Sequence, residues 1–303
     1  MIDDLIYDVG MNNGDDTAYY LHRGYRVVAI DADPQACDKA RLRFQDQVSR
    51  GRLTILNVGI AAEPGTLDFW ICEPHSEWSS FDRRIASRDG SPHHCIQVPC
   101  RTLDSILSDH GIPYYLKVDI EGHDLQCVDA LRTVSNRPKY VSIEIDDIDA
   151  SLRAMADLGY TSFKCISQFT FVPLQLPPTA AQERAEFWRR ILVQRPLPLR
   201  VIRKAIGRRG RRWLDRRYTR TRCHEGWVFN NGSSGPFGED TLGTWLTAER
   251  VRDAYRHYSR LRDQGKPSIF WNADGYSFWA DLHARRDGES LANPLRVGYP
   301  DAP

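Results

Sequence analysis

The chain has 303 residues, of which 41% are hydrophobic and 27% are charged, and its formal net charge is +1. This length suits one large domain or two ordinary ones, and the composition is that of a globular protein, which excludes a disordered chain. Mean hydropathy is -0.51, and no apolar run approaches the roughly 20 residues that cross a bilayer. The start, MIDDLIYDV, carries acidic residues where a signal peptide has basic ones, so we expect a cytoplasmic protein.

The cysteine pattern argues against a disulfide framework. The chain has seven cysteines, an odd number, and none of them belongs to a C-x-x-C pair. Disulfide-rich folds and zinc ribbons show paired spacings. Cys95 and Cys100 lie near His93 and His94, but no second ligand pair accompanies them, which disfavours a metal site there.

Short apolar runs alternate with helical patterns over the first 165 residues. The apolar runs predict strands at 5–10, 25–33, 53–61, 114–122, 140–146 and 161–167. The patterns between them predict helices at 16–24, 34–48, 123–132 and 148–160. In addition, 66–72 alternates and predicts a hairpin arm, and 96–107 predicts an edge strand leading into a helix with Thr102 as its N-cap.

This alternation predicts an α/β fold. Right-handed crossovers between the strands give a Rossmann-like, doubly wound and mainly parallel sheet with helices on both faces. Such sheets bind ligands outside the carboxyl ends of their strands. We therefore expect one edge of the sheet to carry the polar residues that end the strands, namely Asp8, Gly10, Asp31, Asn57, Asp119, Glu121, Glu144 and Asp146.

The remainder of the chain, 166–303, has a different character and predicts an α-rich C-terminal extension. Helical patterns cover 180–194 and 247–265, with a glycine-serine loop at 231–240 that could be a lid or a structural loop. We expect a cofactor-binding domain at 1–165 and an extension that selects the substrate. Aromatic residues late in the chain predict either core packing or a stacking surface.

Eleven basic residues and one acidic residue, Asp215, lie between Arg200 and Arg222. This stretch predicts a solvated arm or a patch for an anionic partner, such as a phosphorylated acceptor or a membrane surface contacted peripherally. Nucleic acid is disfavoured, because the stretch holds only Trp213 and Tyr218 for base stacking and no nucleic-acid motif accompanies it.

The first strand ends in a glycine turn, Asp8-Val9-Gly10-Met11-Asn12-Asn13-Gly14. A dinucleotide fingerprint would carry a middle glycine, so that the backbone could approach a pyrophosphate, and this turn lacks it. A nicotinamide-dependent dehydrogenase is therefore the weaker alternative. S-adenosylmethionine has no pyrophosphate, and Asp31, at the end of the second strand, supplies a carboxylate for its ribose hydroxyls. The third alternative is a tight turn without a ligand.

Four segments follow one another along the chain: DVGMNNGDDT, VVAIDADP, RTLDSIL with YYLKVDIEGHD, and YVSIEID. Together they resemble the FkbM-type methyltransferases, a family of S-adenosylmethionine-dependent enzymes that mostly methylate hydroxyl oxygens. LKVDIEG is the most specific part, and the resemblance covers about the first 165 residues. Asp31 stands where the family usually has glutamate, and Met11 and Asn13 replace its commoner small and aliphatic turn residues.

The turn, the strand ends and the resemblance together predict the cofactor-binding residues. These are Asp8, Gly10, Asn12, Asn13, Gly14, Thr17, Asp31, Ala32, Asn57, Val58, Ser79, Ser80 and Asp119. The serine pair rests on the resemblance, and an ordinary loop is the alternative there.

Methyl transfer to a hydroxyl requires alignment of donor and acceptor and removal of a proton. Strand alternation would put Lys117, Asp119 and Glu121 on one side of their strand. Asp119 is the predicted base or holder of the acceptor, with Glu121 and Lys117 beside it, and His123 is the competing base. The alternative is a structural ion-pair network.

Asp119, Glu144 and Asp146 offer carboxylate oxygens of the kind that magnesium binds, so they are the candidate ligands if the enzyme uses a divalent cation. The predicted function is methylation of a hydroxyl on a small molecule, a sugar or a natural-product intermediate. A non-catalytic docking module that uses the arginine-rich stretch is the alternative from another class of protein.

Overall fold

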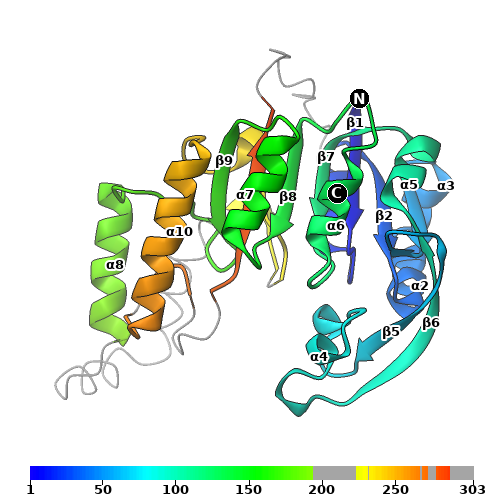
Figure 1. Cartoon of the computed structure of the whole chain (residues 1–303), viewed down its shortest axis with the longest axis horizontal. Coiled ribbons are helices and arrows are strands. Elements are labelled where there is room, and N and C mark those ends of the chain that lie inside the picture. Colours follow the sequence, from blue (N-terminus) through cyan, green and yellow to red (C-terminus); the bar gives the residue numbers. More distant parts are fainter. Residues whose placement is uncertain (194–222, 231, 267, 272–277, 287–303) are drawn as a thin grey trace. The chain divides into compact units, whose positions relative to one another are not determined.

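The computed structural model describes residues 1–193, 223–230, 232–266, 268–271 and 278–286 (Figure 1). The arginine-rich stretch lies outside the described residues, so the interpretations of it stay predictions. The chain forms two compact units. The first comprises Met1–Glu144, Asp157–Tyr160 and Arg285–Pro303, and the second comprises Ile145–Ala156 and Thr161–Ala284. None of the described helices is long and apolar enough to cross a membrane.

Five parallel strands form the sheet of the first unit, in the order β3-β2-β1-β7-β8. Their bounds are Ile2–Val9 for β1, Arg26–Asp31 for β2, Leu53–Asn57 for β3, Pro113–Val118 for β7 and Tyr140–Glu144 for β8. β1 and β7 are nearly continuous buried runs, as strands covered on both faces require. The predicted Rossmann-like, mainly parallel α/β fold is confirmed.

Helices connect these strands (Figure 1). Their bounds are Asp15–His22 for α1, Pro34–Arg43 for α2, Gln45–Ser49 for α3, Leu103–His110 for α5 and Asp124–Ala130 for α6. The Asp33 carboxylate accepts a hydrogen bond from the Gln35 amide and caps α2, whose first residue is Pro34. Thr102 caps α5 by accepting from the Ser105 amide, as the sequence predicts.

A small three-stranded sheet, in the order β4-β6-β5, branches from the first unit between β3 and α5. It contains β4 (Gly59–Ile60), β5 (Gly65–Cys72) and β6 (His93–Arg101), with η1 (Ser76–Trp78), α4 (Arg83–Ala86) and η2 (Arg88–Gly90) between β5 and β6. The predicted hairpin is thus confirmed. Phe69, Val98 and Cys100 pack against Ala32, which follows β2 directly.

Two strands end four residues before the ends of the apolar runs that predict them. The run 53–61 divides at Val58, because Gly59 and Ile60 pair with β6 in the small sheet. The run 114–122 ends at Val118, because the chain then turns through Glu121 at φ 49° and Gly122 at φ 91°. The prediction that strand alternation aligns Lys117, Asp119 and Glu121 is therefore wrong, since two of the three residues lie beyond the strand.

The second unit contains the following helices and strands, except that the last residues of α7 and β12 belong to the first unit: α7 (Ile148–Asp157), β9 (Ser162–Ser167), α8 (Ala180–Val193), β10 (Cys223–His224), β11 (Trp227–Val228), η4 (Gly238–Asp240), α10 (Ala248–Asp263) and β12 (Ala280–Arg285). β12 lies next to β9 and has no counterpart among the predicted strands. The Thr247 side chain caps α10 by accepting from the Arg250 amide. The side chains of Ser233, Ser234 and Phe237 are buried, which favours a structural role for the glycine-serine loop.

Candidate functional site

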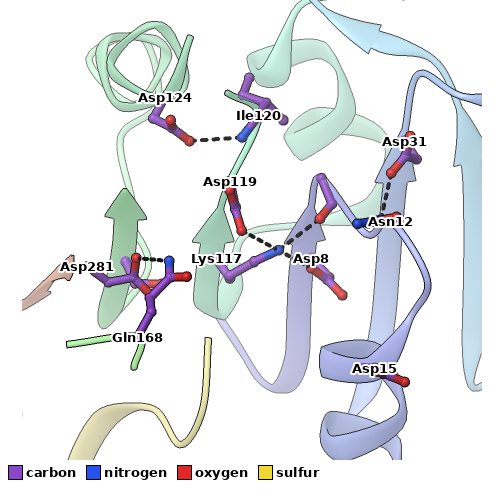
Figure 2. Close-up of polar contacts among 12 residues, drawn as sticks. Asp8, Asn12, Asp15, Asp31, Lys117, Asp119, Ile120, Asp124, Gln168 and Asp281 are labelled. Carbon is purple, nitrogen blue, oxygen red and sulfur yellow. Dashed lines mark hydrogen bonds and ion pairs between the residues drawn. The ribbon is translucent and has the colours of Figure 1, made fainter. Parts of the chain in front are cut away.

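The candidate site lies at the carboxyl edge of the first unit's sheet (Figure 2). It combines the glycine turn after β1, the polar ends of β2 and β3, the acidic turn after β7 and the end of β8. These elements meet because the strands are parallel and adjacent. All the residues discussed as its parts below belong to the first unit unless stated otherwise.

The glycine turn packs directly against the acidic turn. Gly10 has φ 80°, and a Cβ atom there would lie 1.8 Å from the Asp119 carbonyl oxygen. Its amide donates to Ile30 O at 2.9 Å, which folds the turn over the end of β2. Gly14, at φ 75°, leaves room for the Phe44 ring. Both glycines are therefore required by conformation and by space.

The other residues of the turn are largely engaged within the protein. Asn13 is exposed, and its side-chain oxygen accepts from the Asp15 amide at 2.9 Å. Thr17 is fully buried and donates its hydroxyl to Asp8 Oδ2 at 2.6 Å. These contacts fix the start of α1 and the carboxylate of Asp8.

Asp31 ends β2 beside this turn. One carboxylate oxygen accepts from the Asn12 amide at 2.7 Å, and the other accepts from the Asp33 amide at 2.8 Å (Figure 2 shows the first). Burial raises the pKa of Asp31 to about 6, although both backbone amides oppose the shift. Burial therefore destabilises the ionised form of Asp31, and a ligand that donates hydrogen bonds to the carboxylate would stabilise that form.

Asn57, Val58 and Ala32 line the neighbouring strand ends. Asn57 Nδ2 donates to the Asp31 and Ala32 carbonyl oxygens at 3.0 and 3.1 Å, so it joins β3 to the chain after β2. Val58 is half-buried in the step from β3 to β4, and Ala32 lies in the hydrophobic cluster under the small sheet. These residues give the edge its shape.

Lys117 is a buried cation at the centre of the site. Its ammonium donates to the Gly10 carbonyl oxygen at 2.8 Å and lies 3.1 Å from Asp8 Oδ1 and 3.7 Å from Asp119 Oδ2 (Figure 2). Burial by itself would lower the pKa of Lys117, but Asp8 and Asp119 outweigh that effect and hold it well above its ordinary value. Lys117 therefore stays protonated, and it ties the two turns together.

The acidic turn is held from several sides. The Asp119 amide donates to Val9 O at 2.9 Å, and buried Asp124 accepts from the Ile120 amide at 3.1 Å (Figure 2). Glu121 occupies the left-handed region, which is strained for a residue with a side chain. Its carbonyl oxygen accepts from the buried Ser80 hydroxyl at 2.9 Å, and its carboxylate accepts from Arg88 at 3.0 Å.

His123 and Ser79 complete the account of the predicted residues near this turn. His123 precedes α6, and its ring meets Phe81 edge-on with the ring centroids 5.9 Å apart. Ser79 Oγ accepts from the Cys72 amide at 3.1 Å, within the loop of the small sheet. The structure thus gives both predicted serines contacts that shape the loop.

Three carboxylates come together here. One oxygen from each of Asp119, Glu121 and Glu144 lies within 4.8 Å of the other two. Oxygen atoms grouped in this way suit a hard divalent cation. Asp146, which the sequence predicts as a ligand, is exposed and belongs to the second unit, and Glu121 completes the group found in the first unit.

Sequence reasoning missed two residues that contact the site, Ser76 and Arg88. Ser76 donates its hydroxyl to Asn12 Oδ1 at 3.0 Å. Both residues lie in the loop between β5 and β6, outside any periodic pattern, and their partners are 64 and 33 residues away in the chain. No local signal could have found them.

Comparison with known proteins places this chain in the methyltransferase class of proteins. The model of the methyltransferase FkbM domain matches residues 8–164, which is more than half of the chain. The chain belongs to the FkbM methyltransferase family, and the resemblance seen in the sequence is confirmed. No curated protein matches the chain.

Solved structures are similar at low identity. Methyltransferase FkbM from Methylobacillus flagellatus KT is 20% identical, with a TM-score of 0.33 over 47% of this chain and 32% of that one. The precorrin-6y C5,15-methyltransferase from Geobacter metallireducens GS-15 is 16% identical, with a TM-score of 0.31 over 54% and 66%. StiE O-MT is 8% identical, with a TM-score of 0.37 over 94% and 68%. The match spans about a third of the first of these proteins.

Proposed function

We propose that this methyltransferase uses S-adenosylmethionine to methylate a hydroxyl oxygen of a small molecule, a sugar or a natural-product intermediate. The observation that carries the proposal is Asp31, a half-buried carboxylate at the end of β2 beside a glycine turn. Family membership supports the donor in general terms. The acceptor oxygen, the substrate-selecting role of 166–303 and a cytoplasmic location are parts of the proposal.

The residues present fit the cofactor. An ionised carboxylate has about four acceptor sites, and the Asn12 and Asp33 amides occupy one on each oxygen of Asp31. Each oxygen therefore retains capacity for one of the two ribose hydroxyls. When bound, S-adenosylmethionine supplies an electrophilic methyl group on a sulfonium. The glycine turn, Asp8–Gly14, would hold the methionine side.

On the acceptor side, Asp119 is the proposed base. It lies at the start of the acidic turn, its side chain is 26% exposed, and the ammonium of Lys117 is 3.7 Å away. This contact fixes the Asp119 carboxylate at the edge of the site, where it would accept the hydroxyl proton. Lys117 itself cannot be that base, because its pKa is held high and its ammonium is already engaged. His123, on the same turn, is the competing base.

Magnesium is a further part of the proposal. Asp119, Glu121 and Glu144 would hold the ion, and it would polarise the acceptor hydroxyl. If so, excess EDTA lowers turnover and added Mg²⁺ restores it, while binding of S-adenosylhomocysteine is unaffected. Full turnover in chelator would remove the metal from the mechanism.

The two alternatives have less support. A nicotinamide-dependent dehydrogenase would need the backbone at position 12 to approach a pyrophosphate, and Asn12 carries a side chain there. A docking module would rest on residues outside the described structure. Peripheral membrane contact through 200–222 also rests on residues outside the described structure and stays a prediction. An anionic or glycosylated acceptor likewise stays a prediction.

Calorimetric titration with S-adenosylhomocysteine and, separately, with NAD tests the function. We expect micromolar binding of the first and none of the second, followed by product formation with some member of a panel of hydroxylated acceptors. Binding of NAD alone would refute the methyltransferase mechanism. Cofactor binding without turnover, together with anion binding that weakens steeply with salt, would favour the docking module.

A further inference from the structure

The loop between β5 and β6 reaches the cofactor turn at one point. Ser76, the first residue of η1, donates its hydroxyl to Asn12 Oδ1 at 3.0 Å. The neighbouring His75 and Trp78 rings are in contact, with centroids 4.1 Å apart and planes tilted by 33°. Four residues further along the same loop, the Ser80 hydroxyl donates to the Glu121 carbonyl oxygen.

Asn12 is the strained residue of the turn. Its φ of 48° lies in the left-handed region, where asparagine is tolerated better than most residues but is still disfavoured. In this conformation its amide donates to Asp31 Oδ2 at 2.7 Å. The hydrogen bond to Asp31 therefore depends on a left-handed backbone conformation that is unfavourable for Asn12 unless other contacts stabilise it.

We propose, on the basis of the cofactor site inferred above, that Ser76 is a positioning residue for S-adenosylmethionine. Its hydroxyl holds the Asn12 side chain, and this keeps the Asn12 backbone in the left-handed conformation. The Asn12 amide then stays directed at Asp31, whose carboxylate binds the ribose hydroxyls. Ser76 thus acts on the cofactor through two protein contacts.

This role has a signature in the titration of Asp31. The amides of Asn12 and Asp33 and the ammonium of Lys117 lower the pKa of Asp31, whereas burial and the Asp33 carboxylate raise it. A loosened Asn12 amide removes one of the lowering contributions. The pH at which Asp31 ionises therefore rises when Ser76 loses its hydroxyl, and cofactor binding weakens with it.

The experiment measures the Kd of S-adenosylhomocysteine by calorimetry between pH 5 and pH 8 for the full chain. Ser76→Ala should raise Kd about three- to tenfold near pH 7, as expected for one lost hydrogen bond. It should also move the midpoint of the pH profile upward. Because Ser76 is exposed, Tm should not change. Ser76→Thr keeps the hydroxyl and should resemble the wild type.

Two controls separate positioning from a general loop effect. Ser87→Ala removes an exposed hydroxyl of the same loop that donates to Arg84 O, and it should leave Kd and the midpoint unchanged. Asn12→Gly removes the acceptor of the Ser76 bond while tolerating a positive φ. In that background, Ser76→Ala should have no further effect.

The outcomes are distinct. A wild-type protein that does not bind S-adenosylhomocysteine contradicts the proposed function. If the wild type binds but Ser76→Ala matches it in Kd and midpoint, the function stands and the role of Ser76 is overturned. Equal losses in Ser76→Ala and Ser87→Ala, or a Ser76→Ala effect that persists beside Asn12→Gly, overturn it as well.

Discussion

Cofactor affinity should depend on pH through Asp31. Its pKa of about 6 in the folded protein exceeds the ordinary 3.8, because burial outweighs the two amide hydrogen bonds. Ribose hydroxyls that donate to this carboxylate favour its ionised form. At pH 5 about one molecule in eleven carries an ionised Asp31, whereas at pH 8 nearly all do. Binding should therefore strengthen about tenfold between these values, with a midpoint near pH 6.

Calorimetry with S-adenosylhomocysteine across this range measures the effect, with Asp31→Asn as the matched variant. The asparagine is nearly isosteric but cannot ionise, so its Kd should be independent of pH and about 10- to 100-fold weaker at pH 8, as for loss of charge-assisted hydrogen bonds. Comparison with this variant separates Asp31 from any histidine that titrates in the same range. A flat wild-type profile would refute the assignment of Asp31 to the ribose.

The same shift predicts a stability effect of known sign. The folded state holds the Asp31 proton more tightly than the unfolded state does, so the extra stability is present below about pH 4 and is lost as pH rises through about 6. The difference of about 2 pKa units corresponds to about 3 kcal/mol in the free energy of unfolding. Urea denaturation of the wild type and of Asp31→Asn at pH 4 and pH 7 measures it. If the free energy of unfolding changes equally between pH 4 and pH 7 in the two proteins, burial of Asp31 does not destabilise the folded state at pH 7.

Three further predictions concern the two turns. Asp119→Asn should reduce turnover by about 100-fold or more while S-adenosylhomocysteine still binds, and a normal rate would exclude Asp119 as the base. Gly10→Ala should destabilise the protein by about 3 kcal/mol or more in urea denaturation, because its Cβ meets the Asp119 carbonyl oxygen at 1.8 Å; wild-type stability would contradict that contact. Arg88→Met should lower kcat about tenfold, because Glu121 loses its ion pair, and should leave Kd for the cofactor product unchanged. Arg84→Met should leave both kcat and Kd unchanged. Equal effects of the two arginine variants would argue against a role for Arg88 in the site.

Much of the fold could be predicted from local pattern. The apolar runs, the helical periodicity and the Thr102 cap depend on neighbours a few residues away, so the sequence shows them directly. The glycine turn and Asp31 could also be recognised in the sequence, because ligands of parallel sheets bind at the carboxyl ends of the strands. The order of these segments was sufficient to indicate the family.

The tertiary structure decided how that edge is built. Only the fold shows that Lys117 is buried between two carboxylates, that Glu121 adopts a left-handed turn, and that Ser76 contacts Asn12. It also shows that β12, a short strand with a polar pattern, lies beside β9. These features arise from contacts between segments far apart in the chain. Their energies depend on the packing of irregular loops, and irregular loops leave no periodic trace in the sequence.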